Sequence, residues 1–158
     1  FIIHARKGIL KGLSPRQNRN IPPLNYQKVY SIKDDFPELE IIINGGIKNI
    51  GEVKNHLNYV DGVMLGRAAY DDPFMLSDID SEIYSNTKIE ISRKDLLTEY
   101  LDYVHVMTKK GYDPKIMLKH VFGLKKGEKD AKRFRVKVAE IMNSSSLVEN
   151  KDELLSMV

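Results

Sequence analysis

Short apolar runs alternate with amphipathic stretches over about the first 70 residues. The runs at residues 1–4, 40–43 and 62–65 are rich in β-branched side chains, which is typical of strands buried on both faces of a parallel sheet. Between them, residues 26–36 and 50–57 carry apolar side chains at helical spacing. The pattern therefore predicts an α/β fold of βαβ units with right-handed crossovers.

After Pro73 the apolar spacing is helical throughout. Ser92 can cap one helix, Asp113 and Pro114 suit the start of a second, and residues 128–142 predict a third. The serines at 144–146 indicate a break before a short terminal helix. The sequence therefore predicts these parts: an α/β part at 1–80, a linker at 81–91, a small all-α domain at 92–143, and a flexible break with a short helix at 144–158.

Composition sets limits on the class of protein. A chain of 158 residues with 42% hydrophobic and 30% charged residues suggests one domain, or one and a fraction. Its apolar runs are too short to cross a bilayer, and the absence of cysteine excludes a disulfide framework, a thiolate zinc site and a cysteine nucleophile within these residues. We expect no membrane segment and no metal site. Cytoplasm is the default location, or an organelle if a targeting segment lies upstream.

Charge is distributed unevenly along a chain whose net charge is only +3. Residues 71–102 hold nine acidic and three basic side chains, whereas residues 109–137 hold eleven basic and three acidic ones. The basic segment is a candidate polyanion-binding surface, because each phosphate that it neutralises would release counterions. A solvated, lysine-rich helix face explains the same charges equally well.

Each predicted strand ends in a chemically useful group. The carboxyl ends of parallel strands meet at one rim of a barrel, where the loops after the last two strands commonly hold a phosphate. Glycines let backbone amides approach an anion, and an arginine can clamp it with two parallel hydrogen bonds. The candidate groups are His4, then Asn44, Gly45 and Gly46, then Gly66 and Arg67. Each signal alone is weak, but a spacing of one βα unit between the glycine loops favours a phosphate cradle.

His4 is followed by Arg6 and Lys7, so it would lie in a positive rim suited to a polar ring or an anionic ligand. A histidine satisfied within the core is the alternative. The other three histidines show no metal-like spacing and are expected to be structural: His56, His105 and His120.

Residues 12–24 are too rich in polar residues and proline for a helix, and they exceed the usual length of a βα loop. Long ordered loops at a barrel rim are usually functional, so Arg16, Asn18 and Arg19 would project over the mouth of the site. A purely structural loop, stiffened by Pro22 and Pro23, is the alternative.

Taken together, these motifs resemble the tRNA-dihydrouridine synthases, closest to the DusA branch. The match is strong over about residues 1–75 and returns more loosely at 120–124 and 132–135. The residues that carry it are His4-Ala5-Arg6-Lys7, Gly12-Leu13-Ser14-Pro15, Asn18-Arg19, Pro22-Pro23-Leu24, Tyr26, Ile43-Asn44-Gly45-Gly46-Ile47 and Asp61-Gly62-Val63-Met64-Leu65-Gly66-Arg67. Phe134 departs from the pattern, because the family tends to carry tryptophan there, and so does the charged pair Lys125-Lys126.

The resemblance implies the C-terminal part of a TIM (β/α)8 barrel that binds FMN, followed by a helical tRNA-binding domain. Its activity would be the NADPH-dependent reduction of a specific uridine to dihydrouridine in the tRNA D-loop. By position, the flavin contacts would be His4, Asn44, Gly45, Gly46, Gly66 and Arg67. The substrate and tRNA contacts would be Arg6, Lys7, Arg16, Asn18, Arg19, Lys132, Arg133 and Arg135.

The family's catalytic cysteine, its flavin-contacting lysine and its first five strands have no counterpart in this sequence. We therefore expect them upstream and interpret the chain as a fragment with no catalytic residue of its own. A non-catalytic tRNA-binding module and another FMN- or phosphate-binding TIM-barrel oxidoreductase are the alternative functions.

Overall fold

The computed structural model describes residues 1–84, 90–144 and 150–158. Contacts between residues divide the chain into two compact units, Phe1–Ala69 and Tyr70–Val158. The sequence instead suggested a boundary near residue 80. The two units are described separately below, and the predicted domain limits stay a prediction.

The first unit contains a parallel sheet of three short strands in the order β1-β2-β3. These strands are β1 (Ile2–His4), β2 (Ile42–Asn44) and β3 (Gly62–Met64). The predicted α/β class with a parallel sheet is confirmed. β2 begins two residues later than expected, because the backbone N–H of Ile41 donates to the Asp61 carboxylate at 2.8 Å before the ladder starts.

Burial of the strands differs from the prediction. Ile43 in β2 is fully buried, whereas Phe1, Ile2 and Met64 expose 74%, 61% and 45% of their surface. Only β2 has a neighbouring strand on each side among the described residues. Within this chain, β1 and β3 are therefore not buried on both faces as their apolar runs predict, because each lacks a neighbouring strand on one side among the described residues.

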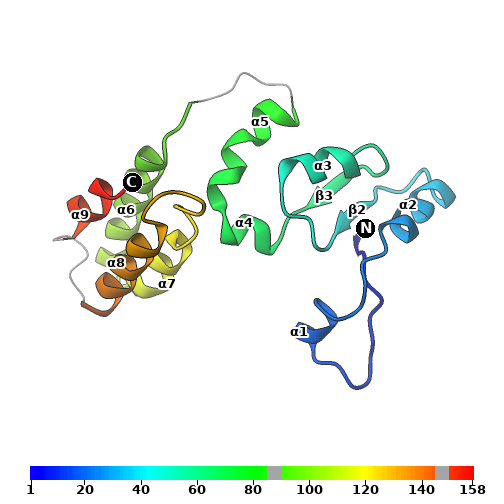
Figure 1. The fold of residues 1–158 in the computed structure, drawn as a ribbon, viewed down its shortest axis with the longest axis horizontal. Helices are drawn as coiled ribbons and strands as arrows, with labels where there is room; N and C mark the ends of the chain where they lie inside the picture. The colour runs from blue at the N-terminus through cyan, green and yellow to red at the C-terminus, as the bar shows by residue number, and fades with distance from the viewer. Residues whose placement is uncertain (85–89, 145–149) are drawn as a thin grey trace. The chain divides into compact units, whose positions relative to one another are not determined.

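The expected helices beside the sheet are confirmed as α2 (Tyr26–Asp35) and α3 (Ile50–His56), capped by the side chains of Asn25 and Asn49. Figure 1 shows both helices alongside the strands, while the loop after β1 extends away from them in this view. The prediction that residues 12–24 contain no helix is wrong, because this loop contains the short helix α1 (Pro15–Asn18). Ser14 caps α1 in a reciprocal capping box, with Pro15 at the first helical position. α4 (Arg67–Asp71) follows β3.

The second unit is helical, as expected. Its elements are η1 (Pro73–Asp78), α5 (Ile79–Glu82), α6 (Arg93–Lys109), α7 (Pro114–Leu118), η2 (Lys119–Val121), α8 (Ala131–Ser144) and α9 (Lys151–Ser156). Ser92 and Asp113 cap α6 and α7 as predicted. α8 begins three residues later than predicted, because Gly127 and Asp130 have positive φ angles of 81° and 62° that interrupt a helix.

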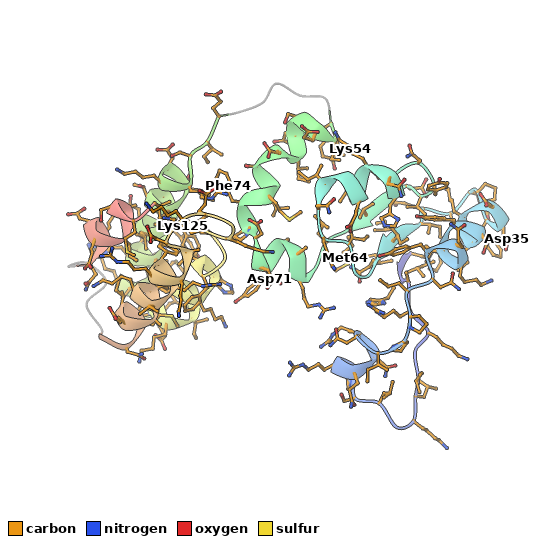
Figure 2. All side chains as sticks on the ribbon, viewed as in Figure 1. Asp35, Lys54, Met64, Asp71, Phe74 and Lys125 are labelled. Carbon is orange, nitrogen blue, oxygen red and sulfur yellow. The ribbon has the colours of Figure 1, made fainter. Side chains whose placement is uncertain are left out.

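The core of the second unit joins α6, α7, α8 and α9 through fully buried side chains, among them Leu97, Leu118, Phe134 and Leu154. Phe74, labelled in Figure 2, packs against this core, and the guanidinium of Arg93 lies 3.9 Å from the centre of its ring. These contacts explain why residues 70–84 group with the helices.

Two predicted segments fall partly outside the described residues. The predicted linker at 81–91 includes residues 85–89, which are not described, while residues 81 and 82 belong to α5. The predicted break includes residues 145–149, which are also not described, and Ser144 is the last residue of α8. α9 corresponds to the expected short terminal helix.

Replacing Phe134 by alanine should destabilise the helical unit by about 3–5 kcal/mol, because it removes a fully buried aromatic ring and leaves a cavity. Denaturant unfolding followed by circular dichroism measures the loss. Val136→Ala on the same helix is the control: Val136 is 50% exposed, so its truncation should change stability by about 0.5 kcal/mol or less. Equal losses for the two variants would contradict this core.

Candidate functional site at the strand ends

The sheet register brings the ends of the three strands together. His4 is the partner of Asn44, and Asn44 is the partner of Met64. The Asn44 amide nitrogen donates to the Met64 carbonyl at 2.8 Å, so this side chain ties the end of β2 to the end of β3. Its amide oxygen has no hydrogen-bond partner among the described residues. Asn44 therefore supports the rim and still offers an acceptor there.

The paired glycines after β2 form a tight turn that other residues would disturb. Gly45 and Gly46 have positive φ angles of 119° and 73°. A Cβ at Gly45 would lie 3.1 Å from the His4 ring, and one at Gly46 would lie 2.5 Å from a Leu24 methyl group. The Tyr26 hydroxyl donates to the Gly45 carbonyl at 2.9 Å, which fixes the turn beside His4. This turn brings bare backbone to the rim, which a cradle for an anion requires.

The loop after β3 carries Gly66 and Arg67. A Cβ at Gly66 would meet nothing within 4 Å, so the space beside this backbone is open. Arg67 is exposed, and its Nη1 donates to the side-chain oxygen of Asn20 at 2.7 Å. Arg67 forms no ion pair with a carboxylate in the part of the chain that the structure describes. Its positive charge is therefore available to an anion.

Three arginines act on His4. Partial burial of the ring lowers the pKa of His4 below its usual 6.5, and the charges of Arg6, Arg67 and Arg19 lower it further, in that order. The imidazole is therefore neutral at neutral pH, with one nitrogen to donate and one to accept. The rim combines a neutral ring with surrounding positive charge. The sequence predicted the positive rim, and the contact of His4 with a ligand stays a prediction.

Arg6 is held between β1 and the long loop. Its Nη1 donates to the Pro22 carbonyl, and its backbone forms an isolated bridge with Leu24. Its Nε is buried and has no hydrogen-bond partner, the only such side-chain atom found among the described residues. An unpaired buried donor costs about 1–3 kcal/mol, and this Nε–H is free to donate to an acceptor.

The long loop is braced by Asn18. Its side-chain oxygen accepts from the Ile9 N–H at 2.8 Å, and its amide nitrogen donates to the Ile9 carbonyl at 2.9 Å. The structure thus gives Asn18 a role inside the loop, while its predicted substrate contact stays a prediction. Lys7, Arg16 and Arg19 are exposed, and nitrogen-tipped side chains project from this loop in Figure 2.

The sequence pattern does not predict two polar contacts of this site, those of Asn20 and Tyr26. Tyr26 follows a capping asparagine at the start of α2, a signal that places its hydroxyl near the strand ends. Asn20 has no comparable signal, because its partner Arg67 lies 47 residues away.

His56 is structural, as expected. It is 3% exposed, and its Nδ1 lies 2.6 Å from the Tyr30 hydroxyl. Its ring also makes an edge contact with Tyr26, with 4.5 Å between ring centres. A hollow of about 670 Å³ between α2 and α3 is lined by these three side chains and by Gly46, among others.

On the second unit, three of the predicted tRNA contacts are presented by α8. Lys132, Arg133 and Arg135 are exposed and form no ion pair with a described residue. In contrast, Lys137 pairs with Glu153 at 2.6 Å, and Lys125 donates to the Met157 carbonyl. The free positive charge of α8 therefore lies on those three side chains, whose contact with RNA stays a prediction.

Neither a metal cluster nor a spanning helix is found in the described ranges. No three His, Asp or Glu side chains there are grouped so as to hold a metal ion, and no helix there is both long and apolar enough to cross a membrane.

Comparison with known proteins covers almost the whole chain. The family model described as dihydrouridine synthase (Dus) matches residues 1–157. A Haemophilus ducreyi protein named tRNA-dihydrouridine(20/20a) synthase is 44% identical over 140 residues, which is 89% of this chain and 43% of that protein. Proteins of the same name from Pseudomonas putida and a Synechocystis species are each 43% identical over 135 residues, covering 85% of this chain and 40% of theirs. The chain thus spans about two fifths of the length of these relatives.

The buried His56 should make stability depend on pH. Desolvation lowers its pKa below 6.5, with Glu52 opposing weakly, so on acidification the unfolded state takes up a proton before the folded state does. The free energy of unfolding should therefore fall as pH drops from about 7 to 5. His56→Gln should reduce that slope without abolishing it, because the pKa of His4 is also lowered.

Urea unfolding at a series of pH values measures this slope. The matched control is His105→Gln on α6, which leaves the Tyr30–His56 pair intact. A slope unchanged in the His56 variant would show that this pair does not contribute to acid sensitivity.

Proposed function

Because the chain belongs to the dihydrouridine synthase family, we propose that the protein carrying it reduces a specific uridine of the tRNA D-loop to dihydrouridine. The relatives bear the name of this activity, but the chain spans only about two fifths of their length, so the activity of the whole protein is part of the proposal. One observation supports it most strongly. The ends of three parallel strands unite a glycine turn, a neutral histidine and three arginines at one rim.

The residues of this rim fit FMN. Gly45 and Gly46 form a positive-φ turn that brings backbone without side chains to the rim, and the open backbone of Gly66 adjoins the unpaired charge of Arg67. We therefore assign the flavin phosphate and ribityl chain to Asn44, Gly45, Gly46, Gly66 and Arg67. When bound, FMN supplies hydride transfer, for which NADPH is the proposed reductant.

His4 and Arg6 would face the ring end of this site. A neutral His4 can donate to a carbonyl oxygen or accept from an N–H, and the buried Nε of Arg6 needs an acceptor. The oxygens of a flavin or uracil ring meet both requirements. The chain contains no cysteine, so we propose that the thiol that protonates the substrate comes from elsewhere in the protein.

We place the three strands as the sixth, seventh and eighth of a TIM barrel. Support comes from their parallel order and from the apolar side chains that β1 and β3 leave exposed. An outer strand with exposed apolar groups is unfavourable unless another strand or helix covers it. The active site at the carboxyl ends then agrees with the general rule for this fold.

The second unit would bind tRNA through α8. Lys132, Arg133 and Arg135 are exposed cations without partners among the described residues, which suits contacts with backbone phosphates. The exposed Arg16 and Arg19 of the long loop, together with Lys7, would contact the substrate nearer the rim.

Flavin binding is the first test. The full gene product that carries this chain should purify yellow, and Arg67→Ala should weaken FMN binding at least about tenfold, because it removes charge-assisted hydrogen bonds to the phosphate. Fluorescence titration of FMN measures the effect. Lys28→Ala, which removes an exposed charge on α2, should bind FMN normally. A colourless wild-type protein with no FMN affinity would refute the enzyme assignment and favour a non-catalytic tRNA-binding module.

Charge reversal on α8 is the second test. Replacing Lys132, Arg133 and Arg135 together by glutamate should weaken tRNA binding and reduce the salt dependence of log K by roughly 2–3, while FMN stays bound. The same reversal at Lys109, Lys110 and Lys115, at the end of α6, its C-cap and the start of α7, provides a control with an equal change of charge. If both triple variants lose the same affinity for tRNA, binding depends on net charge, and α8 is not the tRNA-binding surface.

A further inference from the structure

The contact between Asn20 and Arg67 joins the long loop to the proposed phosphate arginine. We propose that Asn20 is a positioning residue, which orients the guanidinium of Arg67 for the flavin phosphate and thereby links cofactor binding to the order of the loop. This inference rests on the proposed function, since it takes the flavin phosphate as the anion that Arg67 binds.

The geometry leaves Arg67 free to bind an anion. Asn20 accepts from Nη1 at 2.7 Å, which uses one of the five guanidinium donors. The edge formed by Nε and Nη2 remains available for the paired hydrogen bonds that a phosphate accepts. Because the Asn20 amide is neutral, it restrains the arginine side chain without cancelling its charge. An aspartate at the same position would restrain Arg67 and cancel its charge.

Asn20 is itself fixed to the rest of the loop. Its backbone N–H donates to the Gln17 carbonyl at 3.0 Å, and Gln17 takes part in the capping box of α1 with Ser14. Asn18 closes the same loop onto Ile9 with hydrogen bonds in both directions. A restraint on Asn20 therefore acts on α1 and on the segment that carries Arg16 and Arg19.

Coupling between two sites is reciprocal in free energy. If the loop orients Arg67 for the phosphate, bound phosphate must in turn favour the ordered loop by the same factor. The ordered positions of Arg16 and Arg19, the proposed substrate contacts of the loop, would then be more populated when the cofactor is bound. Binding of the flavin would thus order the loop surface that is proposed to contact tRNA.

The test uses the full gene product as wild type, Asn20→Ala and Asn20→Asp. Asn58→Ala is the matched control, since Asn58 is exposed and its side chain makes no hydrogen bond to a described residue. FMN affinity is titrated by fluorescence. Loop order is measured as the rate of tryptic cleavage after Lys11, Arg16 and Arg19, with FMN, with riboflavin and without flavin.

We expect FMN, but not riboflavin, to slow cleavage of the wild-type loop, because only FMN carries the phosphate. Asn20→Ala should weaken FMN binding roughly three- to tenfold and abolish the protection by FMN. Asn20→Asp should weaken FMN binding more, yet protect the loop even without flavin, since its carboxylate pairs with Arg67. A purely structural role for Asn20 would not separate affinity from protection in this way.

Three results overturn the proposal. In the first, Asn20→Ala behaves like Asn58→Ala in both measurements. In the second, riboflavin protects the wild-type loop as well as FMN does. Both leave the flavin assignment intact, because wild type still binds FMN. In the third, wild type binds no flavin, and the proposed function then fails together with this inference.

Discussion

The parallel register of the three strands is the constraint on which the rest of the structure depends. It places His4, Asn44 and Met64 side by side, so three loops that are distant in sequence start from one edge. The register also brings the contacts of the rim within reach. The Asn44 side chain hydrogen-bonds to the end of β3, and the Gly45 turn lies against the ring of His4. A shift of one residue would turn these side chains to the opposite face of the sheet.

On this edge the chain gathers positive charge that it does not neutralise. Burial, and after it the charges of Arg6, Arg67 and Arg19, lower the pKa of His4, and Arg6 keeps a buried Nε–H without an acceptor. Leaving such groups unpaired costs stability. Such a cost is typical of a site that binds a ligand, and the space beside the backbone of Gly66 at the same rim is open.

Regular elements could be predicted from the sequence because their signals are local. Apolar periodicity and capping residues, such as Asn49 and Ser92, lie within one turn of the helices they start. Contacts between loops carry no local signal. Asn20 meets Arg67 across 47 residues, and the bracing of the loop by Asn18 depends on a turn that the sequence pattern did not reveal.

Other differences have equally physical causes. α8 starts late because Asp130 adopts a positive φ, a conformation that few residues other than glycine favour and that sequence periodicity does not show. The outer strands are more exposed than apolar runs suggest, because burial depends on neighbours and not on composition alone. The candidate rim residues were predicted individually, whereas their arrangement around a neutral His4 emerges only from the fold.

The most direct test of this account is a crystal structure of the full gene product with FMN bound. We expect the flavin phosphate to lie within hydrogen-bonding distance of the Arg67 guanidinium and the backbone at Gly46 and Gly66, with Asn20 still hydrogen-bonded to Arg67. A phosphate bound away from this rim, for example in the hollow between α2 and α3, would contradict it.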